Sequence, residues 1–107
     1  MKKNQPRVPS DKQLTAKAQE VGKALGEYGG MLATAESCTG GWVSKLVTDQ
    51  PGSSGWFDRG FVTYSNEAKQ EMLGVSAETL AEYGAVSEET VREMAQGALA
   101  RSNAQVT

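Results

Sequence analysis

The sequence predicts an α/β fold in which helices cover a short parallel sheet. Two patterns carry this prediction. Segments with apolar residues at helical spacing alternate with short β-rich apolar runs, and each such run is followed by a polar turn and another helix. At 107 residues the chain has the length of one domain. It contains no run approaching the ~18 apolar residues of a membrane span, so no membrane association is expected.

The first predicted helix follows a polar N-terminal segment. Residues 1–9 contain two prolines and are expected to form a flexible tail. Ser10 and Gln13 match a capping box, and Gly29-Gly30 ends the helix. Apolar residues recur between these limits at intervals of 4, 3, 4 and 3. The face assigned to the core consists of Leu14, Ala18, Val21, Leu25 and Tyr28.

Two strands are predicted, and both are short. Residues 31–35 form a mostly apolar run typical of a buried strand, and residues 57–64 contain the β-rich run Phe61-Val62-Thr63-Tyr64. Residues 103–107 are expected to lead into a further strand. Because a two-stranded sheet is marginal on its own, we expect later strands of the domain to be missing from this chain. The unpaired sheet edge predicts that the chain either forms a homo-oligomer through that edge or is only marginally stable.

Four more helices are predicted from apolar residues at helical spacing. One begins at Trp42 and is ended by Pro51-Gly52, and residues 53–55 after it are assigned to a loop. The last follows the N-cap Ser87 and has acidic residues in its first turn, where the helix dipole favours negative charge. The other two span residues 66–73 and 77–82, and the inner face of the last helix is assigned to Val91, Met94, Ala95 and Ala98.

The composition excludes several classes of function. The formal net charge is -2, with 11 Lys and Arg against 13 Asp and Glu, so the chain lacks the basic surface of a nucleic-acid binder. The absence of His excludes Ser-His-Asp and Cys-His catalytic units, and with one Cys no zinc site of the usual kind is possible, so no metal is expected. A single Cys fits a reducing cytoplasm. An enzyme of this composition must use Lys, Tyr, Asp or Glu as its base.

The segment Ala35-Glu36-Ser37-Cys38-Thr39-Gly40-Gly41 lies between a predicted strand and a predicted helix, where open α/β sheets bind their ligands. Ser37 or Cys38 could be a nucleophile presented on this turn, and the two glycines would let a substrate approach the main chain. Backbone N–H groups at the start of the following helix could receive an oxyanion. The alternative interpretation is a polar loop in which Thr39 caps the helix.

The segment Tyr64-Ser65-Asn66-Glu67-Ala68-Lys69 also joins a strand end to a helix start. It should therefore lie at the same sheet edge as Ser37, and the two polar junctions would form a crevice. A lysine placed there, Lys69, could act as a general base for the serine, while the Tyr64 hydroxyl could relay a proton or stabilise developing charge. The alternative is a solvated lysine in the first turn of a helix.

Taken together, the two segments resemble the C-terminal domain of the competence/damage-inducible CinA family. The quoted matches are Thr34-Ala35-Glu36-Ser37-Cys38-Thr39-Gly40-Gly41 and Gly60-Phe61-Val62-Thr63-Tyr64-Ser65-Asn66-Glu67-Ala68-Lys69. The stretch Gly84-Ala85-Val86-Ser87-Glu88 also looks like the family's next segment. The similarity extends over residues 14–102. It implies a three-layer α/β/α sandwich, of which residues 10–107 would be the N-terminal part, here lacking the later strands.

The resemblance also implies an activity. Stand-alone members of the family are nicotinamide-nucleotide amidases, which hydrolyse the carboxamide of nicotinamide mononucleotide to nicotinate mononucleotide and ammonia. By matching positions, Ser37 would be the nucleophile and Tyr64 and Lys69 would assist it. The neighbouring residues are expected to bind this small-molecule substrate, without a cofactor and in the cytoplasm. They are Glu36, Thr39, Gly40 and Gly41.

One departure from the family pattern leaves a second class of function open. The family continues with a strand, a glycine-rich loop and more sheet, which this sequence does not contain. We therefore expect little amidase activity from the isolated chain. The alternative function is a non-catalytic module that binds a nucleotide or a partner protein in the competence or DNA-damage response.

Overall fold

A computed structural model describes residues 7–107, so most of the tail predicted for residues 1–9 lies outside the described residues. The sheet consists of β1 (Leu32–Glu36) and β2 (Phe57–Val62). Among the described residues, five α-helices and one 3-10 turn surround it. These elements are α1 (Asp11–Tyr28), α2 (Trp42–Thr48), η1 (Ser53–Gly55), α3 (Asn66–Leu73), α4 (Ala77–Tyr83) and α5 (Glu88–Ala100).

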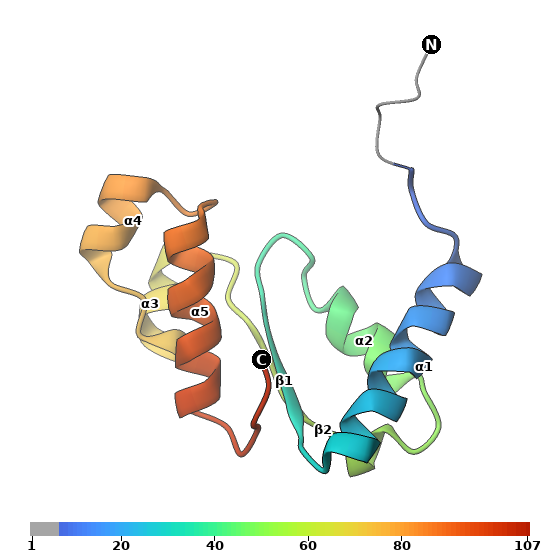
Figure 1. Cartoon of the computed structure of the whole chain (residues 1–107). Helices are drawn as coiled ribbons and strands as arrows, with labels where there is room; N and C mark the ends of the chain where they lie inside the picture. The colour runs from blue at the N-terminus through green and yellow to red at the C-terminus, as the bar shows by residue number, and fades with distance from the viewer. Residues whose placement is uncertain (1–6) are drawn as a thin grey trace.

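The elements form three layers. In Figure 1, α1 and α2 lie on one side of the two strands, and α3, α4 and α5 lie on the other. Each helical layer contacts the sheet, chiefly through α2 against both strands and α5 against β1. The predicted α/β sandwich is confirmed, with a parallel sheet at its centre.

β1 is the central strand of this small sheet. It pairs in parallel with β2, with Glu36 opposite Val62 at the carboxyl end. On its other edge Leu32 forms a parallel bridge with Val106, and the Ala33 amide donates to the Val106 carbonyl at 2.9 Å. The strand expected to begin in residues 103–107 is thus present as a single bridge.

Apolar packing divides between the two faces of the sheet. The cluster under α1 and α2 is built on Leu25, Val47 and Trp56. The cluster on the other face joins α3, α4 and α5, and its buried members are Leu73, Val75, Leu80, Met94 and Ala98. Both predicted helix stripes contribute, since Ala18 and Leu25 of α1 and Met94 and Ala98 of α5 are buried.

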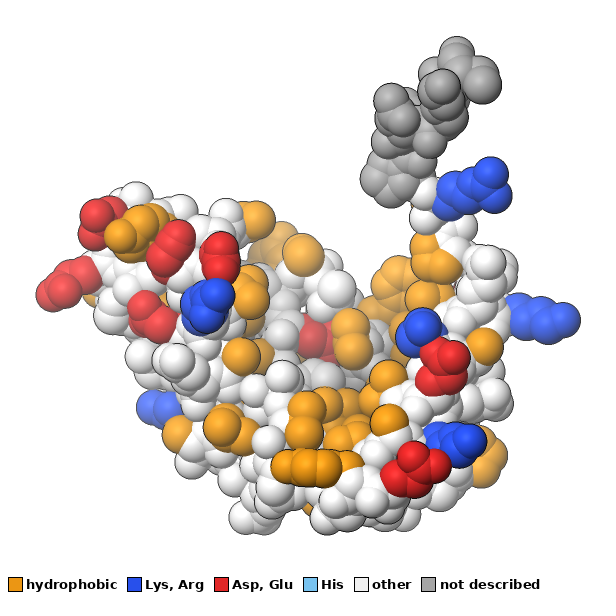
Figure 2. Space-filling view, viewed as in Figure 1, with side chains coloured by type: hydrophobic (Ala, Val, Ile, Leu, Met, Phe, Trp, Pro, Cys, Tyr) orange, Lys and Arg blue, Asp and Glu red, His pale blue; other side chains and the backbone are white. Residues whose placement is uncertain are grey.

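The ends of both stripes were predicted wrongly. Tyr28 is 67% exposed, because the chain turns at Gly29 and the ring lies over Gly30 at the edge of the sheet. Val91 is 59% exposed. It borders a cavity of about 230 Å³ between α5 and β1 that no described residue fills. Figure 2 shows the molecule hollowed between the α1 side and the α5 side, with hydrophobic side chains along the hollow.

One assignment in the next segment also differs from the prediction. α2 ends at Thr48 with Asp49 as its C-cap, ahead of Pro51-Gly52 as predicted. The expected loop at residues 53–55 is the 3-10 turn η1, closed by hydrogen bonds from Gly55 to Gly52 and from Trp56 to Ser53. None of the described helices has both the length and the apolar character that a bilayer crossing requires.

Candidate active site

Two strand-to-helix junctions meet at the carboxyl edge of the sheet. Ser37 directly follows β1, and Tyr64 comes two residues after the end of β2. The Thr63 amide donates to the Glu36 carbonyl at 2.8 Å, which extends the pairing beyond the last strand residues. Because the strands run parallel, the polar segment after each lies beside the other, as the sequence predicted.

Ser37 and Lys69 are in direct contact at this edge. Lys69 Nζ lies 3.1 Å from Ser37 Oγ and 3.0 Å from the Tyr64 carbonyl oxygen. Ser37 Oγ is in turn 3.4 Å from the same carbonyl. The three groups form a closed triangle of hydrogen-bonding atoms, in which one lysine amine and one serine hydroxyl can exchange a proton.

The start of α3 places Lys69 in this contact. Ser65 caps the helix by accepting from the Ala68 amide, and the Lys69 amide donates to the Ser65 carbonyl. Side chains near a helix start lean back toward its N-terminus, which directs Lys69 to the Tyr64 carbonyl. Lys69 is only 1% exposed, and none of the ion pairs among residues 7–107 includes it. The alternative interpretation of a solvated lysine in the first turn of a helix therefore does not hold.

The structure separates the two parts of Tyr64. Its carbonyl belongs to the contact with Ser37 and Lys69, whereas its side chain is 76% exposed. In the part of the chain that is described, the Tyr64 hydroxyl makes no hydrogen bond. The side chain is therefore available to a ligand at the mouth of the site.

Glu36 directly precedes the turn at residues 37–41, here called the serine turn, and is 4% exposed. Its Oε1 accepts from the Val43 amide at 2.9 Å and from Thr39 Oγ1 at 2.8 Å. Its Oε2 accepts from the Ser44 amide at 2.9 Å and from Ser44 Oγ at 2.6 Å. Burial tends to raise the pKa of this carboxyl, but the hydrogen bonds from Ser44, Thr39 and Val43 outweigh it and hold the pKa below its ordinary value.

The remaining predicted residues form the turn itself. The Gly40 amide donates to the Ser37 carbonyl at 2.9 Å, and Cys38 is exposed. Gly41 has a φ of 98°, a conformation that side chains rarely adopt, and a Cβ there would lie 3.3 Å from Val62. Thr39 is bonded to Glu36 and does not cap α2.

Sequence reasoning missed a hydroxyl pair next to Glu36. Thr34 Oγ1 and Ser44 Oγ are 2.8 Å apart, and both lie against Gly60 of β2. A Cβ on Gly60 would meet Ser44 Oγ at 2.2 Å, so any side chain at this position would displace the two hydroxyls. The glycine directly precedes the β-rich run of the second strand, and that was the one signal in the sequence that could have pointed to it.

Comparison with known proteins identifies the family. The profile of the CinA C-terminal domain matches residues 14–107. This chain belongs to the CinA C-terminal domain family. The nicotinamide-nucleotide amidohydrolase PncC of Escherichia coli K12 is 59% identical over 95 residues, which is 89% of this chain and 58% of that protein. The chain thus spans little more than half the length of this relative.

Solved structures of CinA relatives have the same fold. The competence/damage inducible protein CihA of Agrobacterium tumefaciens superposes with a TM-score of 0.84 at 47% identity, over 92% of this chain and 59% of that one. A CinA superfamily protein from Escherichia coli superposes with a TM-score of 0.86 at 32% identity, again over 92% of this chain and 58% of the other.

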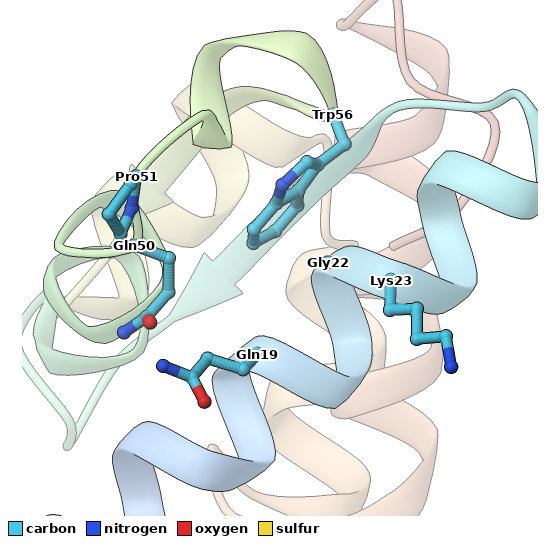
Figure 3. Close-up of a pocket in the computed structure, with 6 residues that line it drawn as sticks. All are labelled: Gln19, Gly22, Lys23, Gln50, Pro51 and Trp56. Atoms are coloured by element: carbon cyan, nitrogen blue, oxygen red, sulfur yellow. The ribbon is translucent and has the colours of Figure 1, made fainter.

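One cavity among the described residues lies away from the two strand-to-helix junctions. A cavity of about 240 Å³ lies between α1 and the segment that precedes β2. Figure 3 shows the Trp56 indole beside Gly22 of α1, with Gln50 and Pro51 on the other side. None of the predicted site residues lines this cavity. Within residues 7–107 no cluster of three His, Cys, Asp or Glu side chains is placed to bind a metal ion.

Proposed function

We propose that this chain carries the nucleophile and base of an amidohydrolase that converts nicotinamide mononucleotide and water to nicotinate mononucleotide and ammonia. The observation that carries the proposal is the 3.1 Å contact between Lys69 Nζ and Ser37 Oγ in a chain without His. The name of the Escherichia coli relative, 59% identical over 95 residues, supports the choice of substrate.

In the proposed reaction, Ser37 Oγ attacks the carboxamide carbon while neutral Lys69 takes the hydroxyl proton. The resulting ammonium group of Lys69 then returns that proton to the leaving nitrogen, and ammonia departs as the C–N bond breaks. An ester to Ser37 remains. Water attacks the ester carbon with Lys69 again as base, which releases the carboxylate product and restores the serine.

The turn supplies further groups for the substrate. Within the described structure, the backbone amides of Cys38 and Thr39 donate to no protein acceptor, so they are available for the carbonyl oxygen of the carboxamide. Gly40 and Gly41 keep the approach to this main chain free of side chains. We assign the exposed Tyr64 side chain to contact with the substrate at the mouth of the site.

The setting of the reaction follows from composition. A small nucleotide substrate needs no cofactor for this hydrolysis, and the acidic balance of the chain opposes nucleic-acid binding. We place the reaction in the cytoplasm, where the exposed Cys38 stays reduced. A homo-oligomer remains our expectation, with the outer edge of the short sheet as its contact.

The test measures ammonia released from nicotinamide mononucleotide by a complete domain, in which this chain is joined to the later strands of the family, and by two neighbouring variants of it. Ser37→Ala should lower the rate on the order of 10³-fold or more, since it removes the nucleophile of a unit that acts together. Cys38→Ser is the matched control and should keep most of the rate, because among the described residues no hydrogen bond joins the exposed thiol to a base. The reverse ranking would move the nucleophile to Cys38. Binding of the nucleotide without turnover would favour a non-catalytic module.

A further inference from the structure

We propose that Glu36 is a positioning residue: its carboxylate fastens the turn at residues 37–41 to the first turn of α2 and so holds Ser37 Oγ within reach of Lys69 Nζ. The effect on turnover rests on the proposed function, whereas the effect on geometry does not. The sequence had suggested substrate contact for this residue. Its hydrogen bonds point to a different role.

The first turn of α2 has no cap of its own. Its N-cap residue is Gly41, which has no side chain, and no side-chain hydrogen bond caps the helix from that position. The second and third helical residues, Val43 and Ser44, instead donate their amides to Glu36. A carboxylate from the preceding strand thus replaces the serine, threonine or aspartate that usually occupies the N-cap.

Both carboxylate oxygens must be acceptors for this arrangement to exist. Oε1 faces the Val43 amide and Oε2 faces the Ser44 amide, and a backbone N–H cannot reverse its direction. A glutamine would turn its NH₂ group toward one of these two amides. The requirement is therefore for a carboxylate, not for a polar side chain of that length.

Glu36 is anchored to β2 as well as to α2. Its carbonyl accepts from the Thr63 amide at 2.8 Å, and its carboxylate accepts from Thr39 Oγ1 inside the serine turn. Ser37 is the next residue in the chain after Glu36. Its hydroxyl contacts the Tyr64 carbonyl and Lys69 Nζ, which lie after β2. A shift of the Glu36 side chain would thus move the turn relative to α3, which carries Lys69.

The test uses the full chain with Glu36→Gln, Glu36→Asp and a matched control. Glu93 makes the corresponding contacts far from Ser37: it accepts from the Ser76 amide at 2.8 Å and from Thr79 Oγ1 at the start of α4. Glu93→Gln therefore removes a similar carboxylate from another helix start. For each variant we would measure the Ser37–Lys69 separation in a crystal structure, the melting temperature, and kcat and KM for ammonia release.

We expect Glu36→Gln to lengthen the Ser37–Lys69 separation beyond hydrogen-bonding distance and to lower kcat on the order of 10²-fold, with KM much less affected. Glu36→Asp keeps two acceptor oxygens on a shorter arm and should fall between Glu36→Gln and the unmodified chain. Glu93→Gln should lower the melting temperature and leave the 3.1 Å contact and kcat unchanged.

The inference is overturned if Glu36→Gln keeps both the contact and kcat at the level of Glu93→Gln. If Glu36→Gln does not fold, Glu36→Asp decides, and an unmodified separation in that variant overturns the inference. Absence of ammonia release from the unmodified chain would count against the proposed function alone, because the Ser37–Lys69 separation would still test the positioning.

Discussion

The two junctions at the carboxyl edge of the sheet start their helices in different ways. α3 is capped locally, by Ser65 immediately before it. α2 is capped from a distance, by Glu36, which is seven and eight residues before the two amides that it binds. The locally capped junction contributes the buried amine of Lys69, and the distantly capped one contributes Ser37.

The two junctions also differ in what their buried polar side chain binds. The first junction is the one after β1, with Glu36 and Ser37, and the second is the one after β2, with Tyr64 and Lys69. At the second junction the buried amine of Lys69 forms hydrogen bonds with the Ser37 hydroxyl of the other junction and with the Tyr64 carbonyl. At the first junction both carboxylate oxygens of the buried Glu36 accept hydrogen bonds from the turn that follows it and from the first turn of α2. The comparison predicts that losses at the second junction reduce reactivity, whereas losses at the first reduce both stability and reactivity.

The largest expected effect is that of Lys69→Met. Methionine has a similar length and would fill the buried site without an amine, so the free energy of unfolding should stay the same or rise. Ammonia release should fall on the order of 10³-fold, as for loss of any member of a unit that acts together. Urea unfolding and turnover of the same preparation check this. A variant that loses stability but keeps turnover would contradict the chemical role of the second junction.

Gly60→Ala should act through the first junction. The new Cβ would meet Ser44 Oγ at 2.2 Å and Thr34 Oγ1 at 2.8 Å, and moving the Ser44 hydroxyl breaks its bond to Glu36. We expect a loss of about 1–3 kcal/mol in the free energy of unfolding, together with reduced turnover.

The control for Gly60→Ala is Gly26→Ala in α1, where a Cβ would have no atom within 4 Å. That variant should be stabilised by about 0.5–1 kcal/mol, because glycine is unfavourable inside a helix. Equal free energies of unfolding of the two variants in urea would show that the Thr34 and Ser44 hydroxyls are not tightly packed against Gly60.

The smallest effect is expected for Ser65→Ala, which removes the local cap of α3. It should lower the free energy of unfolding by about 1 kcal/mol and change turnover far less than Glu36→Gln does. Ser10→Ala, which removes the cap of α1, should cost a similar amount and leave turnover unchanged. If Ser65→Ala reduced turnover as strongly as Glu36→Gln, the contrast between local and distant capping would be lost.

The sequence predicted what short-range signals determine. The capping box of Ser10 and Gln13, the helix at residues 66–73 and the proximity of Ser37 to Lys69 all follow from neighbours in the chain or from parallel topology. The role of Glu36 did not, because it depends on two amides of α2 that lack an acceptor at the N-cap, where Gly41 has no side chain. The fit of Ser44 against Gly60 joins a helix to a strand, and no local pattern encodes it.

The central place of β1 has a consequence for amide hydrogen exchange. Leu32 donates its amide to Trp56 on one edge, and Ala33, with 0% exposure, donates to Val106 on the other. The edge toward Val106 is a single bridge and opens more easily than the pairing with β2, so the Ala33 amide should exchange faster than the Leu32 amide. The turn that carries Ser37 thus follows the strand residues paired with β2, which should be the slowest-exchanging amides of the sheet, whereas the exposed Tyr64 side chain lies past the end of β2.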